Sequence, residues 1–240
     1  EINLNHVPDA LAAADYAVLL KRIVKGVARA NDLDATFMAK PYGMQAGSGM
    51  HVHFSVLDES GRNIYVGENG PADTLLHSVG GLLEAMGESM AVFAPHQNSY
   101  RRLRPSEHAP TYASWGFDNR SAAVRVITAS KPATRIEHRV AGSDTNPYLV
   151  LAMILSAALA GMKEKTPPGG AISGDDHAVS HEPLPTNWDY AIQRFAKSSF
   201  AYAALGPKYR GLYTACKQQE LSEFSQRVTD VEYDAYIRTV

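Results

Sequence analysis

The 240-residue sequence has a single cysteine, no long apolar run and almost no excess of either charge. One cysteine, Cys216, excludes an internal disulfide and a zinc site built from several cysteines. We interpret Cys216 as a packing residue in a chain suited to a reducing compartment, which favours a cytoplasmic location. The apolar segment from Tyr148 to Met162 is shorter than the roughly 20 residues of a membrane-spanning helix, so no membrane contact is predicted.

The charge pattern also argues against nucleic acid as a partner. The formal net charge is −2, and no stretch interleaves aromatic with basic residues in the way that single-strand binding needs. Basic residues do gather locally between Arg101 and Arg139, which indicates an anionic small molecule. The hydrophobic content of 45% and charged content of 20% are ordinary for a globular domain with a substantial core.

The spacing of apolar residues predicts an α+β domain with a mainly antiparallel sheet and helices on one side. Residues 58–61 read as a hairpin turn between two strands, and Asn146-Pro147 is typical of the start of a helix. The expected helices cover 9–30, 72–92, 147–162 and most of 188–240, the expected strands cover 36–40, 50–57, 63–66 and parts of 112–140, and 164–188 is an exposed loop.

The most informative segment runs from Gly47 to Ser55 and joins a glycine-rich loop to a strand. In a strand His51, His53 and Ser55 share one face at intervals of about 6.6 Å, while the residues between them face a core. Ligand-capable side chains beside free backbone amides suit a site for a metal and a nucleotide. The alternative is a half-exposed strand with incidental histidines.

Three further clusters carry arginine. Arg101, Arg102 and Arg104 repel one another, which indicates either an anionic partner or a solvated basic loop, and His108 nearby is either a base or a surface residue. Arg125 interrupts an apolar strand after the turn that carries Arg120, and its ordinary explanation is an edge arginine that reaches solvent.

In the third cluster, an extended 135–139 segment places Arg135, Glu137 and Arg139 on one face. The arrangement is either a salt-bridge ladder or a metal-binding carboxylate flanked by arginines for a carboxylate or phosphate. Together the segments offer a carboxylate, two histidines and several arginines, which is the inventory for phosphoryl transfer to a carboxylate.

These segments resemble a known family. Lys40-Pro41 followed by Gly47 to His53 and Ser55 is similar to the ATP-region signature of glutamine synthetases. The segments 98–103, 119–122, 135–137 and 146–148 follow in the family's order and approximate spacing, and the resemblance covers nearly all of 1–163. It implies that residues 1–240 form the glutamine-synthetase catalytic domain, with its curved, mainly antiparallel sheet.

The resemblance also implies a role for each matching residue. The metal, Mg²⁺ or Mn²⁺, would be bound by Glu1, His51 and Glu137, and glutamate would be held by Gly47, Arg102 and Arg139. ATP would contact His53, Ser55, Arg120, Arg125 and Arg135, with Arg120 placed against the transferred phosphoryl group as a catalytic residue.

The implied reaction has two steps. The γ-carboxylate of glutamate attacks ATP to give γ-glutamyl phosphate, and an amine then displaces phosphate. Ammonia-using members of the family carry a glutamate where this chain has His108, which could still act as base but attracts a small cation less strongly. With residues 37–42, this difference resembles the γ-glutamylpolyamine or γ-glutamylputrescine synthetase branch, so a primary amine or polyamine is the expected acceptor and ammonia the alternative.

The chain also departs from the family pattern by what precedes Glu1. Family members have an N-terminal β-grasp domain and further metal-binding glutamates upstream, and their active sites lie between subunits of a double ring. We therefore expect a fragment with little ligase activity of its own, taken from a homo-oligomeric protein. A catalytically inactive structural or regulatory relative and an ATP-grasp ligase are the competing readings, and the retained His51, Arg120, Glu137 and Arg139 favour the enzyme.

Overall fold

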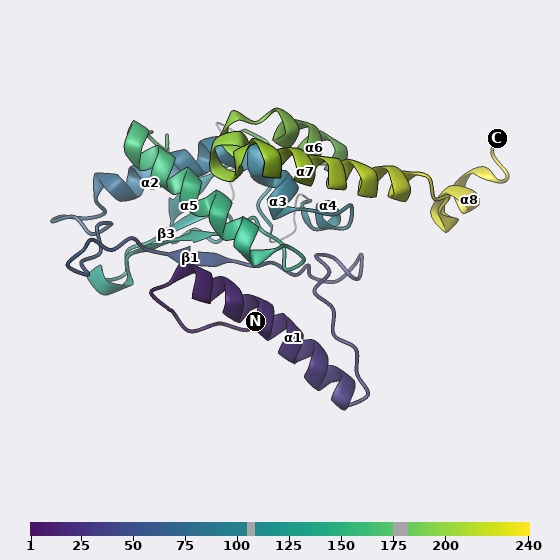
Figure 1. Ribbon diagram of the computed structural model, residues 1–240, viewed down its shortest axis with the longest axis horizontal. Helices are drawn as coiled ribbons and strands as arrows, with labels where there is room; N and C mark the ends of the chain where they lie inside the picture. Colours follow the sequence, from purple (N-terminus) through teal and green to yellow (C-terminus); the bar gives the residue numbers. More distant parts are fainter. Residues whose placement is uncertain (105–108, 175–181) are drawn as a thin grey trace.

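The computed structural model describes residues 1–104, 109–174 and 182–240 of the chain. Four short strands form one sheet, and helices of very different lengths pack around it (Figure 1). The strands are β1 (Val52–Phe54), β2 (Trp115–Phe117), β3 (Val124–Ile127) and β4 (Arg135–His138). The α-helices are α1 (Ala10–Ala30), α2 (Asp73–Met86), α3 (Met90–Phe93), α4 (Ser99–Arg102), α5 (Pro147–Glu164), α6 (Trp188–Lys197), α7 (Ser199–Ser225) and α8 (Asp230–Tyr236), with 3₁₀ turns η1 (Gly87–Ser89) and η2 (Lys131–Ala133).

The sheet has the order β1-β4-β3-β2, and two of its three pairings, β1–β4 and β4–β3, are antiparallel as predicted. The pairing of β2 with β3 is parallel, which the sequence analysis did not foresee. Parallel neighbours normally need a crossover of about a dozen residues. Here β2 is three residues long, about 10 Å, so the connection 118–123 suffices to return to its start.

The main core lies between the sheet and a layer of helices on one side of it, where α2, α5 and α7 run above β1 and β3 in Figure 1. Two glycines let α2 and α5 approach closely: a Cβ on Gly81 would lie 2.7 Å from the Cα of Gly161. Asn146 caps α5 by accepting from the N–H of Tyr148 and Leu149, so the predicted start of this helix is confirmed.

The helix α5 is 18 residues long and more apolar than the other long helices α1, α2, α6 and α7. By length and composition alone it could cross a membrane, the one helix of this kind in the part of the chain that the structure describes. Its face toward α2 carries Val150, Met153 and Ile154, all fully buried in the main core. We therefore read its apolar character as that of a core helix.

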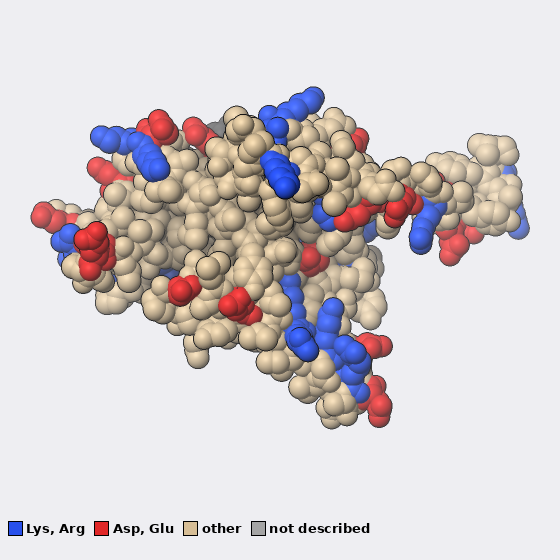
Figure 2. Space-filling view, in the orientation of Figure 1, with Lys and Arg blue, Asp and Glu red and all other residues tan. Residues whose placement is uncertain are grey.

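The helix α1 lies below β1 in Figure 1 and contacts α5 of this layer, where the hydroxyl of Tyr148 donates to Asp15. Asp9 caps it by accepting from the N–H of Leu11 and Ala12. Ala14 is its one buried residue, and apolar side chains such as Ile23 are exposed. In the space-filling view of Figure 2, a group of Lys and Arg side chains lies over α1, while most of the face shown carries no charge.

Two predicted strands do not form. The 36–40 segment has no ladder partner; instead the main chain of Lys40 exchanges two hydrogen bonds of 2.9 Å with the side chain of Asn98. The 63–66 segment makes only isolated bridges, at Asn63 and Val66. Within the described ranges the 36–40 segment finds no strand to pair with, whereas 63–66 pairs with 56–58 across the predicted turn over too few residues to form a ladder.

Candidate active site

The alternation of side chains along the strands gives the sheet one apolar and one polar face. On β4, Ile136 and His138 point into the core and are at most 1% exposed, whereas Glu137 points to the other face. The register places His53 of β1 opposite Glu137 on one side and Arg125 of β3 opposite it on the other. The polar side chains of three strands therefore meet at Glu137.

Four side chains surround the Glu137 carboxylate. Arg139 donates from Nη1 to Oε1 at 2.6 Å, and Arg125 donates from Nη1 to Oε2 at 3.1 Å. The Nδ1 of His51 lies 3.1 Å from Oε1, and the Nε2 of His53 lies 3.7 Å from the same oxygen. With its side chain 3% exposed, Glu137 is a buried anion compensated by direct contacts.

These contacts keep the carboxylate charged. Burial alone would raise the pKa of Glu137, but the hydrogen bond with His51 and the charge of Arg139 outweigh it and lower the pKa to about 2. The pKa of His53 is lowered, because burial and the nearby arginines outweigh the attraction of Glu137. At neutral pH the cluster therefore holds an ionised carboxylate beside a neutral imidazole, His53.

Part of this cluster fits a divalent metal ion. The Nδ1 of His51 and Oε1 of Glu137 are adjacent, and an imidazole with a carboxylate suits Mn²⁺, while Mg²⁺ prefers oxygen ligands. Glu1, the third predicted ligand, is exposed in the extended segment before α1. Within the described residues no group of three His, Cys, Asp or Glu side chains is gathered that could hold a metal, so the predicted set is assembled in part.

The glycine-rich loop lies against the predicted glutamate-binding arginine. Arg102 is 6% exposed and donates from Nη1 to the carbonyl of Val140 at 2.8 Å. A Cβ on Gly47 would lie 2.9 Å from Cγ of Arg102, and one on Gly49 would lie 2.8 Å from its Nη2. The glycines are therefore required by the close approach of Arg102, which the sequence did not reveal.

Backbone hydrogen bonds fix this loop to the chain that follows β4. Met50 donates to the carbonyl of Ala141 at 2.8 Å, and Ser143 donates to that of Ser48 at 3.1 Å. The Nη2 of Arg102 also lies 3.4 Å from the carbonyl of Arg139. The segments that carry His51, Arg102 and Glu137 thus meet in one region.

The remaining predicted ATP-contacting residues lie at the edge of the cluster. Arg135 donates from Nε to the Nδ1 of His53 at 3.1 Å, so these two are in contact. Arg125 also donates to Asp118 at 3.0 Å, a partner that the sequence analysis missed. Ser55 is half-exposed just beyond β1, on the face of His53, and no hydrogen bond joins it to the cluster among the residues described.

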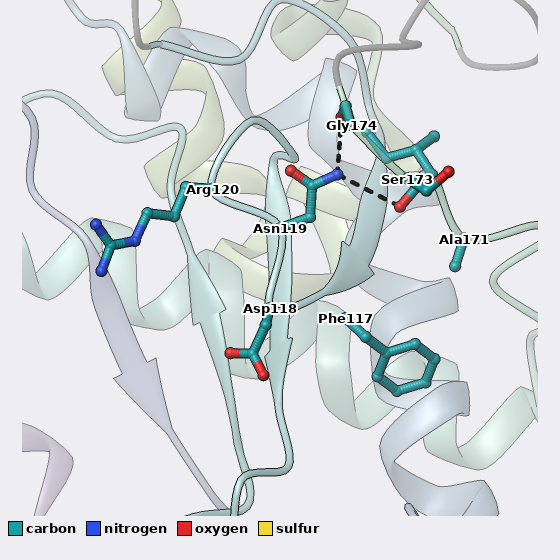
Figure 3. Close-up of a pocket in the computed structure, with 8 residues that line it drawn as sticks. Phe117, Asp118, Asn119, Arg120, Ala171, Ser173 and Gly174 are labelled. Carbon is teal, nitrogen blue, oxygen red and sulfur yellow. Dashed lines mark hydrogen bonds between the residues drawn. The ribbon is translucent and has the colours of Figure 1, made fainter.

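Arg120 is exposed and stands apart from Glu137, with no hydrogen bond or ion pair to the cluster in the described ranges. It lines a pocket of about 630 Å³ between the β2–β3 connection and residues 171–174. Figure 3 shows the amide of Asn119 directed at Gly174, to whose carbonyl it donates at 2.9 Å, and the Arg120 guanidinium directed the opposite way. The predicted base, His108, lies outside the described residues.

Comparisons with known proteins give a consistent family. The family described as glutamine synthetase, catalytic domain, matches residues 1–236. The γ-glutamylputrescine synthetase PuuA of Escherichia coli is 39% identical over 235 residues, which are 98% of this chain and 50% of that protein. A glutamine synthetase of Pyrococcus horikoshii is 40% identical over 233 residues, 93% of this chain and 52% of the relative.

A glutamate–isopropylamine ligase of a Pseudomonas species is 34% identical over 243 residues, 99% of this chain and 53% of the relative. Among solved structures, "Apo GmaS without ligand" is similar with a TM-score of 0.85 and 33% identity over 96% of this chain and 54% of that one. The chain therefore spans about half the length of the proteins that it matches.

Proposed function

This chain belongs to the glutamine synthetase family, and from that premise we propose that it is the catalytic domain of an ATP-dependent ligase joining glutamate to an amine. The observation that carries the proposal is the buried Glu137 carboxylate, held by Arg139, Arg125 and His51 on a sheet face beside Arg102. A buried anion among several cations is suited to a site that handles phosphate and carboxylate groups.

In the proposed first step, a γ-carboxylate oxygen of glutamate bonds to the γ-phosphorus of ATP, and ADP leaves. In the second, the amine nitrogen bonds to the γ-carbonyl carbon, phosphate leaves, and the amine gives up a proton. A bound Mg²⁺ or Mn²⁺ would neutralise charge on the phosphates. The chain's own ligands for it would be Glu1, His51 and Glu137, of which the last two are in contact.

The arginines would divide the remaining work. Arg102 and Arg139, with the backbone at Gly47, would hold glutamate, and their buried positions would exclude water from its carboxylate. Arg125 has a buried Nε without a partner in the described part of the chain, so its donors are not fully used by the protein. With exposed Arg120 it would meet the phosphates, while His53, Ser55 and Arg135 would contact the nucleotide.

We propose a primary amine or polyamine as the acceptor and ammonia as the second candidate. The relatives support the reaction class more than the acceptor. A relative named for putrescine and one named as a glutamine synthetase are almost equally similar to this chain, at 39% and 40% identity. His108, where ammonia-using members carry a glutamate, favours the larger amines, since a neutral or cationic imidazole captures ammonium poorly. His108 would act as the base of the second step.

The acceptor is tested with the full-length enzyme, ATP, glutamate and either putrescine, isopropylamine or ammonium, by measuring phosphate release and the amide product. We expect kcat/KM for putrescine or isopropylamine to exceed that for ammonium by about tenfold or more. His108→Glu should shift the ratio toward ammonium. If ammonium is the best acceptor, the assignment to the γ-glutamylpolyamine or γ-glutamylputrescine synthetase branch is wrong. If phosphate is released equally well without any amine, the proposed ligase activity is wrong.

The setting of the enzyme is part of the proposal. We expect a cytoplasmic homo-oligomer, as the family resemblance implies, and little turnover by residues 1–240 alone, because Glu1 does not join His51 and Glu137 here. Sedimentation of the full-length protein tests the first expectation. Turnover by residues 1–240 close to that of the full-length enzyme would contradict the second.

A further inference from the structure

The proposed function gives no role to Asp144, whose largely covered side chain lies on the chain that follows β4 and contacts Ser99 and His96. Its side chain is 9% exposed, and its Oδ1 is buried without a hydrogen-bond partner among the described residues. Its Oδ2 accepts from the hydroxyl of Ser99 at 2.6 Å and lies 3.1 Å from Nδ1 of His96. An ionised side chain in such a place is costly unless a cation compensates it.

The contacts of Asp144 define where α4 begins. Ser99 is the first residue of this four-residue helix, and its hydroxyl also accepts from the N–H of His96 at 3.0 Å. Arg102 is the last residue of the same helix. A carboxylate on the chain that follows β4 therefore holds the start of the helix whose end carries the proposed glutamate-binding arginine.

Arg102 has no carboxylate in contact within the ranges that the structure describes. Its Nη1 and Nη2 donate to the carbonyls of Val140 and Arg139, at 2.8 and 3.4 Å. Burial lowers the pKa of Arg102 to about 10. The charge of Asp144 opposes this lowering, and the charge of Arg139 adds to the lowering. Asp144 is thus the anion that offsets the buried charge of Arg102, and it does so from beyond hydrogen-bond distance.

We propose that Asp144 is the positioning residue for Arg102: it fixes α4 through Ser99 and balances the guanidinium charge without occupying the guanidinium. The inference rests on the proposed function, in which Arg102 binds a carboxylate of glutamate. Arg139, which is paired directly with Glu137, shares its charge with that carboxylate. A counter-charge at a distance keeps Arg102 in place and leaves its charge for the substrate.

The kinetic test uses the full-length enzyme with Asp144→Asn, which keeps an oxygen acceptor for Ser99 and removes the charge. We expect KM for glutamate to rise about tenfold, with kcat and KM for ATP changed by less than about twofold. Asp189→Asn, at an exposed position on α6, is the matched control. An unchanged KM for glutamate in Asp144→Asn would overturn the charge-balancing role.

Lys21 provides a second control, because its Nζ donates to the carbonyl of Thr145 at 2.9 Å, and burial lowers its pKa while the charge of Asp144 opposes that lowering. If Asp144 served mainly to hold Lys21, Lys21→Met would reproduce the rise in KM for glutamate. We expect it to leave that KM unchanged. A matching rise in Lys21→Met would overturn the assignment to Arg102.

A measurement without catalysis separates this inference from the proposed function. In α4 the amides of Ser99 and Arg101 donate to the carbonyls of His96 and Asn98, at 3.0 and 3.1 Å. Hydrogen exchange at both should quicken about tenfold or more in Asp144→Ala and remain near the wild-type rate in Asp144→Asn. Unchanged exchange in Asp144→Ala would overturn the positioning role even if the enzyme proved not to use glutamate.

Discussion

Glu137 and Arg102 are both buried and charged, yet their surroundings compensate them in opposite ways. Glu137 touches Arg139, Arg125 and His51 directly. Arg102 donates to main-chain carbonyls, with its counter-charge on Asp144 beyond direct contact. The first arrangement holds a carboxylate ionised, and the second leaves a cation that touches no anion directly in the described part of the chain.

The difference matches the roles proposed for the two groups. A carboxylate that binds metal must stay deprotonated, and neighbouring cations ensure this by lowering its pKa. Arg102, proposed to bind a substrate carboxylate, keeps its charge available for it, whereas Arg139 shares its charge with Glu137. The comparison therefore predicts that changes at Glu137 affect stability and catalysis together, while changes around Arg102 affect mainly glutamate binding.

The largest expected effect follows from Glu137→Gln, which removes the charge and leaves two arginines without their partner. Turnover of the full-length enzyme should fall about 100-fold or more. The free energy of unfolding should fall by about 3 kcal/mol, because unpaired buried charges remain. Denaturant titration and phosphate release measure both, with exposed Glu223→Gln on α7 as control. Near-normal turnover would separate Glu137 from the reaction.

Acid should weaken the protein through the same group. The pKa of Glu137 is lowered in the folded chain from 4.5 to about 2. The stabilisation is therefore present above about pH 4.5 and is lost as the pH falls toward 2, and it amounts to about 3 kcal/mol. Urea unfolding of the wild-type protein between pH 5 and 2.5 should show this loss. The free energy of unfolding of Glu137→Gln should fall less over the same pH range. Equal pH dependence in both proteins would contradict the ion-pair assignment.

A smaller effect is expected from Arg102→Lys, which keeps the charge but not the planar guanidinium that reaches Val140 and Arg139. For glutamate, kcat/KM should fall by about 30-fold, with little change for ATP. Arg101→Lys changes an exposed neighbour on the same helix and should be silent. Equal effects on glutamate and ATP would mean that Arg102 supports the fold and does not select the substrate.

The smallest expected effect is that of Gly49→Ala, whose new Cβ would lie 2.8 Å from Nη2 of Arg102 and would displace it. KM for glutamate should rise about tenfold, the usual size for a moderate steric misplacement. Gly43→Ala is a strict control, since a Cβ at Gly43 meets nothing within 4 Å. If the two variants behave alike, contact between the loop and Arg102 is unimportant.

Much of the fold was predictable because it depends on local patterns. Helical spacing located α1 correctly, and Asn146-Pro147 located the start of α5. The strand predicted at 36–40 was wrong, since extended chain becomes a strand only when a neighbour supplies hydrogen bonds, and Asn98 binds Lys40 instead. The parallel pairing of β2 and β3 depends on how a six-residue connection folds back, which no local pattern encodes.

The candidate site was predictable in its residue types and less so in its contacts. Alternation placed His51 and His53 on one face of their strand and Glu137 and Arg139 on one face of theirs, and the structure brings the two pairs together. The partners Asp118 and Asp144 were missed, because each lies in a loop where side-chain direction does not follow a period. The turn that carries Arg120 likewise gave no indication that this residue lines an exposed pocket.

The sequence by itself determined which chemical groups are present and which side of each strand they occupy, because a strand's two-residue period fixes its faces. The tertiary structure decided which of these groups touch. Strand register places Arg125 beside Glu137. Arg102 is packed between the glycine loop and the chain after β4, where it contacts no carboxylate in the described part of the chain. Register and loop packing arise from contacts between distant residues, so they follow from the whole fold.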